Sequence, residues 1–442
     1  MSESGPGHRR EDAGPIAEVP PFGRDFDRWG LALKLWAIYG DCYDVVQVRI
    51  ARQPIVDGRL SVIGYELLFR DAARQGPGDG EKARGAASSQ LLLRGFVDGG
   101  DRSLCEGMPA FLNIPAGWVE SGLADLLPVE SVVLEIETPN EASSSSLDRL
   151  AELRARGFRI AIDRAHRAED MAAFGRTADF IKVDARSLSA GALEAVVEAC
   201  PDSTVIVTHV ENREVFERCR TAGAQGFQGY FLSRPHVVDE GDVAAGRSKS
   251  AELLVAAMGD FKALHRLIRM DPVLTYRLLR VANSVHYRRG ELTGEVQRAL
   301  ELLGEDGVRK WLSMVALATV KGKPSVLLDA ALIRARTSEL IAQRSRRKKT
   351  TFFFMVGMFS LLDALMDRSL KSLLDGLPGS EDLQVALLER RGPGAEILET
   401  VVAQELGDFE RAQLPDMDRQ SVQQAYLDAI VWVREMGGLL KE

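Results

Sequence analysis

The amino-acid sequence predicts an α/β barrel followed by an all-α domain. Between residues 45 and 235, strand-like and helix-like segments alternate in units of roughly 20–30 residues, which is typical of a parallel α/β domain, and their number favours a barrel. After Pro235 the strand signals stop, and hydrophobic residues recur at helical spacing. A chain of 442 residues has room for two or three domains at about 150 residues each.

Composition and charge restrict the class of protein. With 56 Lys and Arg against 64 Asp and Glu, the net charge of −8 disfavours a general attraction to nucleic acid. The four cysteines form no CxxC pair, which favours a reducing compartment. The longest apolar run, Phe352–Leu362, is shorter than the ~20 residues that span a bilayer, so we interpret it as a buried helix. We therefore expect a cytoplasmic protein that has no contact with membranes.

The first residues differ from the rest of the chain. Residues 1–28 are rich in Gly, Pro and charged residues, and we expect a flexible tail. Residues 30–39 have the composition of a short helix. Whether this extension of residues 1–44 belongs to the native protein stays open.

The expected barrel domain spans residues 45–240. Its strands are expected at 46–51, 62–69, 110–114, 132–136, 158–162, 180–183, 205–208 and 226–232. Its helices are expected at 86–97, 146–156, 192–199 and 213–222. Asp57-Gly58 forms a hairpin turn, so the first two strands should be antiparallel. Gly157 and Gly223 follow two of the helices, at the position where glycine commonly ends a helix.

The second half is expected to be a helical domain of residues 251–442, after a linker at 241–250 with two glycines. Asp271-Pro272 is a typical helix start, since aspartate caps the helix and proline suits its first position. Leu274, Leu278 and Val281 then share one face. Further helical stretches are expected near 296–303, 311–320, 330–341, 352–365 and 422–433.

Polar residues recur at the carboxyl ends of the expected strands, the end of a barrel that carries active sites. The series consists of Glu66, Asn113, Glu135, Asp163, Lys182, Glu211 and Gln228. Carboxylate and amide oxygens suit magnesium or manganese, and a lysine beside them could orient or deprotonate a water molecule. One such residue alone would be read as a surface charge, but seven at successive strand ends indicate a site.

Several of these residues lie in motifs that resemble the EAL domain. The motifs are Gln53-Pro54-Ile55, Glu66 with Arg70, Asn113, Leu134-Glu135-Ile136, Lys182-Val183-Asp184 and Gln228-Gly229-Tyr230. Members of that family hydrolyse the second messenger cyclic di-GMP to linear pGpG on a modified (β/α)8, TIM-like barrel. The resemblance covers residues 46–240.

The helical half resembles the HDOD domain, a helical relative of HD-type metal hydrolases. The matching residues are Asp271-Pro272, Asn283-Ser284 and residues 357–363. None of the six histidines precedes an aspartate, and Asp363 follows Leu362 rather than histidine. The domain is therefore expected to bind a partner or to regulate, not to hydrolyse. The combination resembles the EAL–HDOD class of bacterial signalling proteins.

The EAL resemblance implies a role for each matching residue. The metal ligands would be Glu66, Asn113, Glu135, Asp163 and Glu211, holding magnesium or manganese if the metal site still functions. Lys182 would be catalytic, assisting the attacking water. The nucleotide would be bound by Arg70, Gln53, Gln228, Arg164 and Asp184. Candidate partners are cyclic di-GMP, a signalling protein that contacts the HDOD domain, and a second copy of the chain.

Two departures from the EAL pattern bear on activity. Arg164 stands where active relatives carry a second aspartate, and Thr208 stands where a glutamate ligand belongs. Arginine keeps its charge and would repel a second metal, so two-metal hydrolysis is not expected. Arg164 would either fill a vestigial pocket as a salt bridge or bind a phosphate. His166 and His209 could replace ligands, but hydrogen-bonded or solvent-facing roles are favoured.

The leading hypothesis is a catalytically degenerate EAL–HDOD signalling protein, in which the barrel senses cyclic di-GMP or serves as an interaction scaffold. One alternative is a slow phosphodiesterase that uses one metal and Lys182. Another is an adaptor that binds no nucleotide. The basic run at residues 344–349 is a candidate patch for nucleic acid or an acidic partner, but no aromatic platform accompanies it, and a solvated helix end is favoured.

Overall fold

The computed structural model describes residues 48–71, 104–114, 124, 127–137, 144–163, 174–187, 191–235, 245–284, 286–288, 290 and 292–440. By proximity of Cα atoms the chain divides into Met1–Asp44 and Val45–Glu442. All the described residues belong to the second unit. The expected tail, the helix at 30–39 and the helix at 86–97 lie outside the described residues.

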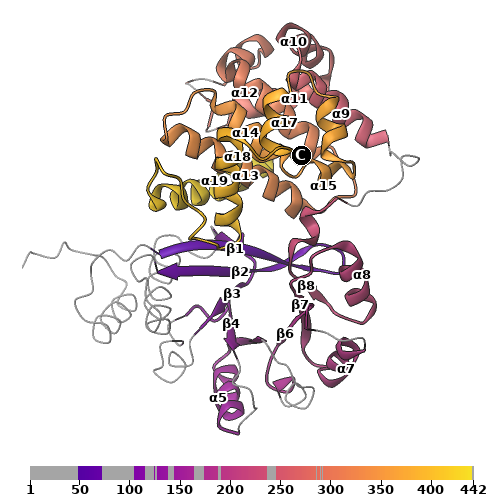
Figure 1. Ribbon diagram of the computed structural model, residues 1–442, viewed down its shortest axis with the longest axis vertical. Coiled ribbons are helices and arrows are strands. Elements are labelled where there is room, and N and C mark those ends of the chain that lie inside the picture. The colour runs from indigo at the N-terminus through magenta and orange to yellow at the C-terminus, as the bar shows by residue number, and fades with distance from the viewer. Residues whose placement is uncertain are drawn as a thin grey trace, which may run out of the picture. The chain divides into compact units, whose positions relative to one another are not determined.

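Eight strands form a closed barrel in sequence order (Figure 1). The strands are β1 Val48–Asp57, β2 Val62–Asp71, β3 Ala110–Asn113, β4 Val132–Glu137, β5 Arg159–Asp163, β6 Phe180–Asp184, β7 Thr204–Thr208 and β8 Gly226–Phe227. β1 is antiparallel to both β2 and β8, and the other neighbours are parallel. The predicted fold, a modified (β/α)8 barrel with an antiparallel first strand, is confirmed.

The last strand is shorter than the sequence predicts. β8 ends at Phe227, and Tyr230–Ser233 form a 3-10 turn, η3, in place of the expected strand to residue 232. Gly229 explains the difference, because its φ of 152° turns the chain, and an added Cβ would lie 2.3 Å from the carbonyl oxygen of Val210. Only glycine tolerates that conformation and that close approach.

The described barrel helices match their predicted places. They are α5 Ser144–Ala155, α7 Ala192–Ala199 and α8 Arg213–Thr221. The side chain of Asn212 accepts a hydrogen bond from the amide of Val215 (3.0 Å), which caps the first turn of α8. Gly157 and Gly223 both have positive φ just after a helix, as expected for helix stops.

The second half is helical, as the sequence predicts. Its helices are α9 Ala245–Met258, α10 Phe261–Met270, α11 Pro272–Ala282, α12 Val296–Ala318, α13 Ser325–Arg344, α14 Thr350–Phe359, α15 Leu362–Met366, α16 Leu370–Asp375, α17 Glu381–Leu387, α18 Gly392–Glu405 and α19 Arg419–Leu440. Asp271 caps α11, since its carboxylate accepts from the amides of Val273 and Leu274. Residues 245–250, expected in the linker, instead form the first turns of α9.

α14 confirms the interpretation of the apolar run at 352–362 as a buried helix. Its residues from Phe353 to Phe359 are all buried, within the core of the helical domain. An added Cβ on Gly357 would lie 2.4 Å from the carbonyl oxygen of Arg334, so glycine allows α14 to pack directly on α13. Among the described helices, none has the length and apolar character needed to cross a bilayer.

The interior of the barrel is filled in two layers. The lower layer is apolar and contains Ile55, Phe111, Val133, Ala161 and Ile206, with Ile63 and Phe180 packed against them. β2 and β8 contribute glycines to this layer. A Cβ added to Gly64 would lie 2.6 Å from the Phe111 side chain, and a Cβ added to Gly226 would lie 2.7 Å from the Ile206 side chain. Because strand side chains alternate, residues two positions further towards the carboxyl ends face the same interior.

The helical domain covers the edge of β1 that has no neighbouring strand. β8 pairs only with Val56 and Asp57, so the first half of β1 lacks a second strand neighbour. The Gln423 side chain accepts from the Ile50 amide (2.8 Å) and donates to the Ile50 carbonyl (3.0 Å), to which Gln404 also donates (2.9 Å). Two buried side-chain amides thus take the place of a neighbouring strand. Figure 1 shows α19 reaching β1.

Candidate functional site

The upper layer of the barrel interior is polar. On β2 to β8, each polar residue comes two positions after the residue of the apolar layer. On the antiparallel β1, it comes two positions before. Its members are Gln53, Glu66, Asn113, Glu135, Asp163, Lys182, Thr208 and Gln228. Strand register therefore brings together six of the seven strand-end residues found in the sequence. The seventh, Glu211, lies in the turn between β7 and α8.

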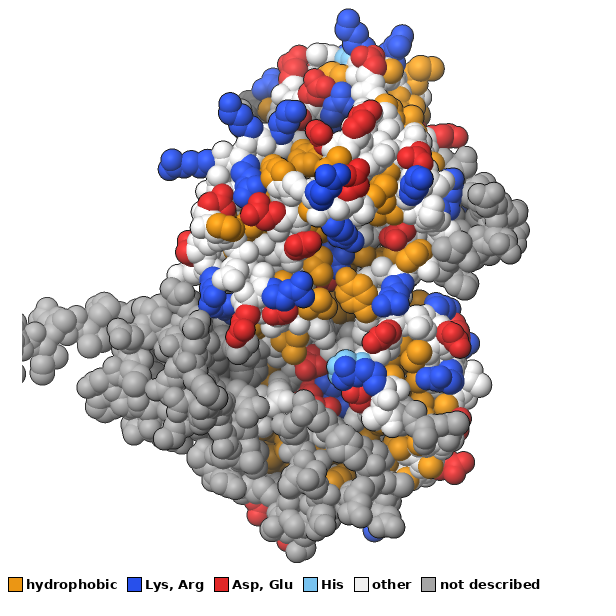
Figure 2. Space-filling model, viewed as in Figure 1, with side chains coloured by type: hydrophobic (Ala, Val, Ile, Leu, Met, Phe, Trp, Pro, Cys, Tyr) orange, Lys and Arg blue, Asp and Glu red, His pale blue; other side chains and the backbone are white. Residues whose placement is uncertain are grey.

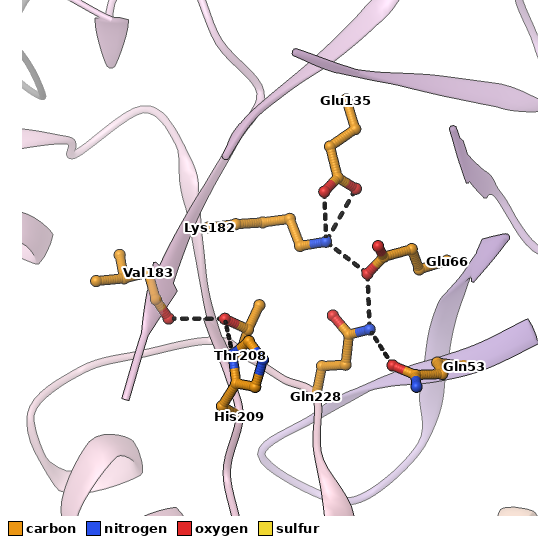
Figure 3. A network of polar contacts seen from close by, with 8 residues as sticks. All are labelled: Gln53, Glu66, Glu135, Lys182, Val183, Thr208, His209 and Gln228. Carbon is orange, nitrogen blue, oxygen red and sulfur yellow. Dashed lines mark hydrogen bonds and ion pairs between the residues drawn. The ribbon is translucent and has the colours of Figure 1, made fainter. Parts of the chain in front are cut away.

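Lys182 is the centre of this layer (Figure 3). Its side chain is 2% exposed, and its ammonium donates to Glu66 Oε2 (2.7 Å) and to both carboxylate oxygens of Glu135 (2.8 and 2.9 Å). Gln228 donates to the same oxygen of Glu66 (2.7 Å) and to Gln53 Oε1 (3.0 Å). The Gln228 amide oxygen is buried with no hydrogen-bond partner among the described residues, so it can accept a bond from a ligand or water.

The charges in this cluster are strongly coupled. Burial by itself would raise the pKa of Glu66, but the Lys182 ammonium and the hydrogen bond from Gln228 together lower it. Burial and repulsion from Glu66 raise the pKa of Glu135 to about 8, against the pull of Lys182. Burial would lower the pKa of Lys182, but the two carboxylates raise it above its ordinary value. Lys182 is therefore charged near neutral pH, and the two carboxyl groups titrate as a coupled pair in which Glu135 holds a proton more tightly than Glu66 does.

A cavity of about 680 Å³ opens above the polar layer, within the range of roughly 300–1,000 Å³ that is typical of small-ligand sites. All seven strand-end residues line it, as do Gln53, Asp184, Arg186, Thr208 and His209. Figure 2 shows charged side chains of both signs around a hollow on the face in view. The predicted site residues that the structure describes with their side chains thus share one cavity.

Thr208 occupies the β7 position of the polar layer. Its hydroxyl is buried and donates to the carbonyl oxygen of Val183 (3.3 Å), and it lies 3.3 Å from His209 Nδ1. A hydroxyl that is held by the backbone provides no negative charge for a cation. The structure therefore places a neutral group on β7 where the EAL pattern has a carboxylate.

Asp184 and His209 lie at the rim of the cavity. Arg186 donates to both carboxylate oxygens of Asp184 (2.7–3.2 Å), and these hydrogen bonds lower the pKa of that carboxyl group. His209 is half-exposed, with Nδ1 3.3 Å from Asp184 Oδ2. It has a positive φ of 54°. The hydrogen-bonded, solvent-facing role expected for His209 agrees with this geometry.

Other predicted residues cannot be compared in the same way. Arg164 and His166 lie outside the described residues. Arg70 belongs to β2, where the backbone but not the side chain is described. The assignment of Arg70 and Arg164 to phosphate binding stays a prediction.

The donor set offers a cation a limited choice of ligands. Carboxylate and amide oxygens line the cavity, and these types suit magnesium or manganese. Among the described residues, however, no three His, Cys, Asp or Glu side chains lie close enough together to hold a metal ion. Among the described residues, Asn113 and Asp163 line the cavity as further oxygen ligands, and a cation would compete with Lys182 for Glu66 and Glu135.

One wall of the cavity comes from the helical domain, and sequence reasoning did not find it. The wall residues are Val326, Leu327, Asp329, Ala330 and Ile333 of α13, with Glu405, Leu406 and Tyr426. Apolar residues at helical spacing predict burial in a core, and nothing in the pattern distinguishes a residue that faces a cavity. Only the packing of α13 reveals this role.

Two arginines of the basic run at residues 344–349 form ion pairs with carboxylates of α19 and α18. Arg344 contacts Asp428 (2.6 Å), and Arg347 contacts Glu396 (3.1 Å). Arg346 and Lys349 have positive φ at the bend between α13 and α14. These contacts favour the interpretation as a solvated helix end.

Comparisons with known proteins follow the same division of the chain. The model of the EAL domain matches residues 116–235, and the model of the HDOD domain matches residues 247–366. The chain is an EAL–HDOD protein. The two matches together span more than half of its length.

Two relatives are similar to this EAL–HDOD protein over most of its length. "Cyclic di-GMP phosphodiesterase CdgJ" of Vibrio cholerae is 28% identical over 404 residues, 88% of this chain and 93% of the relative. "Uncharacterized protein YuxH" of Bacillus subtilis is 26% identical over 409 residues, 88% of this chain and 99% of the relative. Among solved structures, the FimX EAL domain from Pseudomonas aeruginosa bound to c-di-GMP is 20% identical, with a TM-score of 0.34, covering 47% of this chain and 95% of that one.

Proposed function

We propose that this EAL–HDOD protein binds cyclic di-GMP in the mouth of its barrel and acts as a nucleotide sensor without two-metal hydrolysis. The observation that carries this proposal is the polar layer. It retains Lys182, Glu66 and Gln228 beneath a cavity of small-ligand size, but it has the neutral Thr208 on β7. The name of the Vibrio relative supports cyclic di-GMP as the ligand.

The polar layer has the chemistry to hold a cyclic dinucleotide. The buried amide oxygen of Gln228 can accept from a base or sugar, and Arg186 at the rim can contact a phosphate. Hydrolysis by two metals needs carboxylates on both sides of the scissile phosphate. Thr208 and, in the sequence, Arg164 remove two of these, so we infer binding without rapid turnover.

A second candidate is a slow phosphodiesterase with one metal. Glu66, Asn113, Glu135 and Asp163 line the same cavity as Lys182, which favours this candidate. When bound, a divalent cation would supply Lewis-acid polarisation of the phosphate. Lys182 would hold a water molecule or balance charge beside it.

Calorimetry and chromatography separate these candidates. Cyclic di-GMP is titrated into the full chain without metal, with magnesium and with manganese, and long incubations are analysed for pGpG. We expect binding heat and no pGpG. Metal-dependent pGpG that disappears in Glu66→Ala would establish the phosphodiesterase. Absence of binding heat at high micromolar nucleotide would refute nucleotide binding and leave an adaptor.

A further inference from the structure

The cavity above the polar layer has two chemically different sides. Its floor is the barrel interior, in which Lys182, Glu135 and Gln228 are buried and polar. The wall from the helical domain includes an apolar face of α13 with Val326, Ala330 and Ile333, beside the acidic Asp329 and Glu405. Val326, Ala330 and Ile333 are spaced i, i+4 and i+7, so they share one side of the helix. The cavity is therefore amphipathic across its depth.

This division matches the chemistry of a cyclic dinucleotide. Such a molecule has a ring of phosphates and sugars, which needs polar partners, and flat bases, which are stabilised by apolar contact. Leu406, which is 42% exposed, extends the apolar wall beyond the end of α18. Leu406 adjoins Gly407, where an added Cβ would lie 2.9 Å from Leu68 of β2, so the apolar wall meets the barrel there without a gap.

α13 is held firmly in this position. Arg334, with a 3% exposed side chain, forms an ion pair with Glu405 of α18 (2.6 Å). Tyr230, which follows the Gln228-Gly229 turn of the barrel, lies close enough to the same arginine to contribute, after Glu405, to raising its pKa against burial. A buried arginine with neighbours on both sides fixes the helix relative to the barrel mouth.

We propose that α13 forms part of the nucleotide site: its face with Val326, Ala330 and Ile333 contacts a base of the bound cyclic dinucleotide. This inference rests on the proposed function, since it concerns the same cavity. The helical domain then touches the ligand directly. Nucleotide binding can therefore affect the helical domain directly, because α13 both lines the cavity and packs in the helical core.

The test adds volume to the wall. Ala330 is half-buried at the cavity, so Ala330→Phe should place a ring where the base would lie. Gln343→Phe adds the same ring at an exposed position of α13 that does not line the cavity, and it is the matched control. Cyclic di-GMP is titrated into the full chain by calorimetry. We expect Ala330→Phe to weaken binding by about tenfold or more, with Gln343→Phe within about twofold of the unmodified chain.

Hydrogen exchange gives a second readout that needs no variant. Cyclic di-GMP should slow amide exchange in residues 322–334 of the unmodified chain, as well as around Gln228. Protection around Gln228 alone, or unchanged affinity in Ala330→Phe, would overturn the role of α13 and leave nucleotide binding intact. If the unmodified chain binds no cyclic di-GMP, the proposed function itself fails. Thermal unfolding of Ala330→Phe shows whether weak binding reflects a lost fold.

Discussion

Two buried groups of charged side chains, one in each domain, differ in their surroundings. In the barrel, Lys182 is the ion-pair partner of both Glu66 and Glu135 among the described residues, and the group faces the cavity. In the helical domain, Lys310 and Arg336 both pair with Glu339 (2.5 and 2.6 Å), away from the cavity. Burial of charge is thus common to a candidate site and to a structural contact. The cavity and the excess of carboxylates distinguish the first.

The largest effect is expected from removing the lysine that pairs with both Glu66 and Glu135. Lys182→Met would leave Glu66 and Glu135 facing each other without a positive charge, which should lower the free energy of unfolding by about 3–5 kcal/mol. Lys310→Met is the matched control. Glu339 keeps its ion pair with Arg336 there, so the loss should be about 1–2 kcal/mol. Urea denaturation measures both, and equal losses would show that the two groups do not differ.

A smaller effect is expected where the two domains meet. Replacing both Gln404 and Gln423 by alanine leaves the amide and carbonyl of Ile50 buried without partners. The free energy of unfolding should fall by about 2–3 kcal/mol, and exchange of the Ile50 amide should accelerate. Gln424→Ala, on the exposed side of α19, should change stability by less than about 0.5 kcal/mol. Unchanged protection of Ile50 in the double variant would argue against these contacts.

The smallest effect concerns a single carboxylate in the helical domain. Burial raises the pKa of Asp363, so the folded state binds its proton more tightly than the unfolded chain does. Stability from this group is full below the ordinary carboxyl pKa and falls as pH rises through the raised value. Asp363→Asn should therefore be more stable than the unmodified chain at neutral pH, with the advantage lost in acid. Urea midpoints across pH measure this, and a constant difference would contradict it.

Much of the fold follows from local patterns. Three local features occur where the sequence predicts them: the glycines after α5 and α8, the helix cap at Asp271 and the turn at Asp57-Gly58. The errors lie where tertiary contact overrides local signals. β8 ends at Phe227 because the backbone of Gly229 turns and packs closely against the backbone of Val210. α9 begins at Ala245, inside the expected linker. A backbone contact between distant segments leaves no periodic trace in the sequence.

The candidate site divides in the same way. Its polar floor could be predicted, because the carboxyl ends of parallel strands meet at one end of a barrel. The pairing of Lys182 with both Glu66 and Glu135 could not, since it depends on register across three strands. The wall from α13 was also inaccessible to pattern reasoning, because Ala330 and Ile333 look like ordinary core residues.

The sequence by itself determined the order of the domains, the barrel with its antiparallel first strand, and the identity of the polar groups at the strand ends. These depend on spacing and residue type, which are local properties. The tertiary structure alone decided which charges neutralise one another, how Ile50 finds its partners and which helix closes the cavity. Those depend on distances between segments far apart in the chain, and only folding sets such distances.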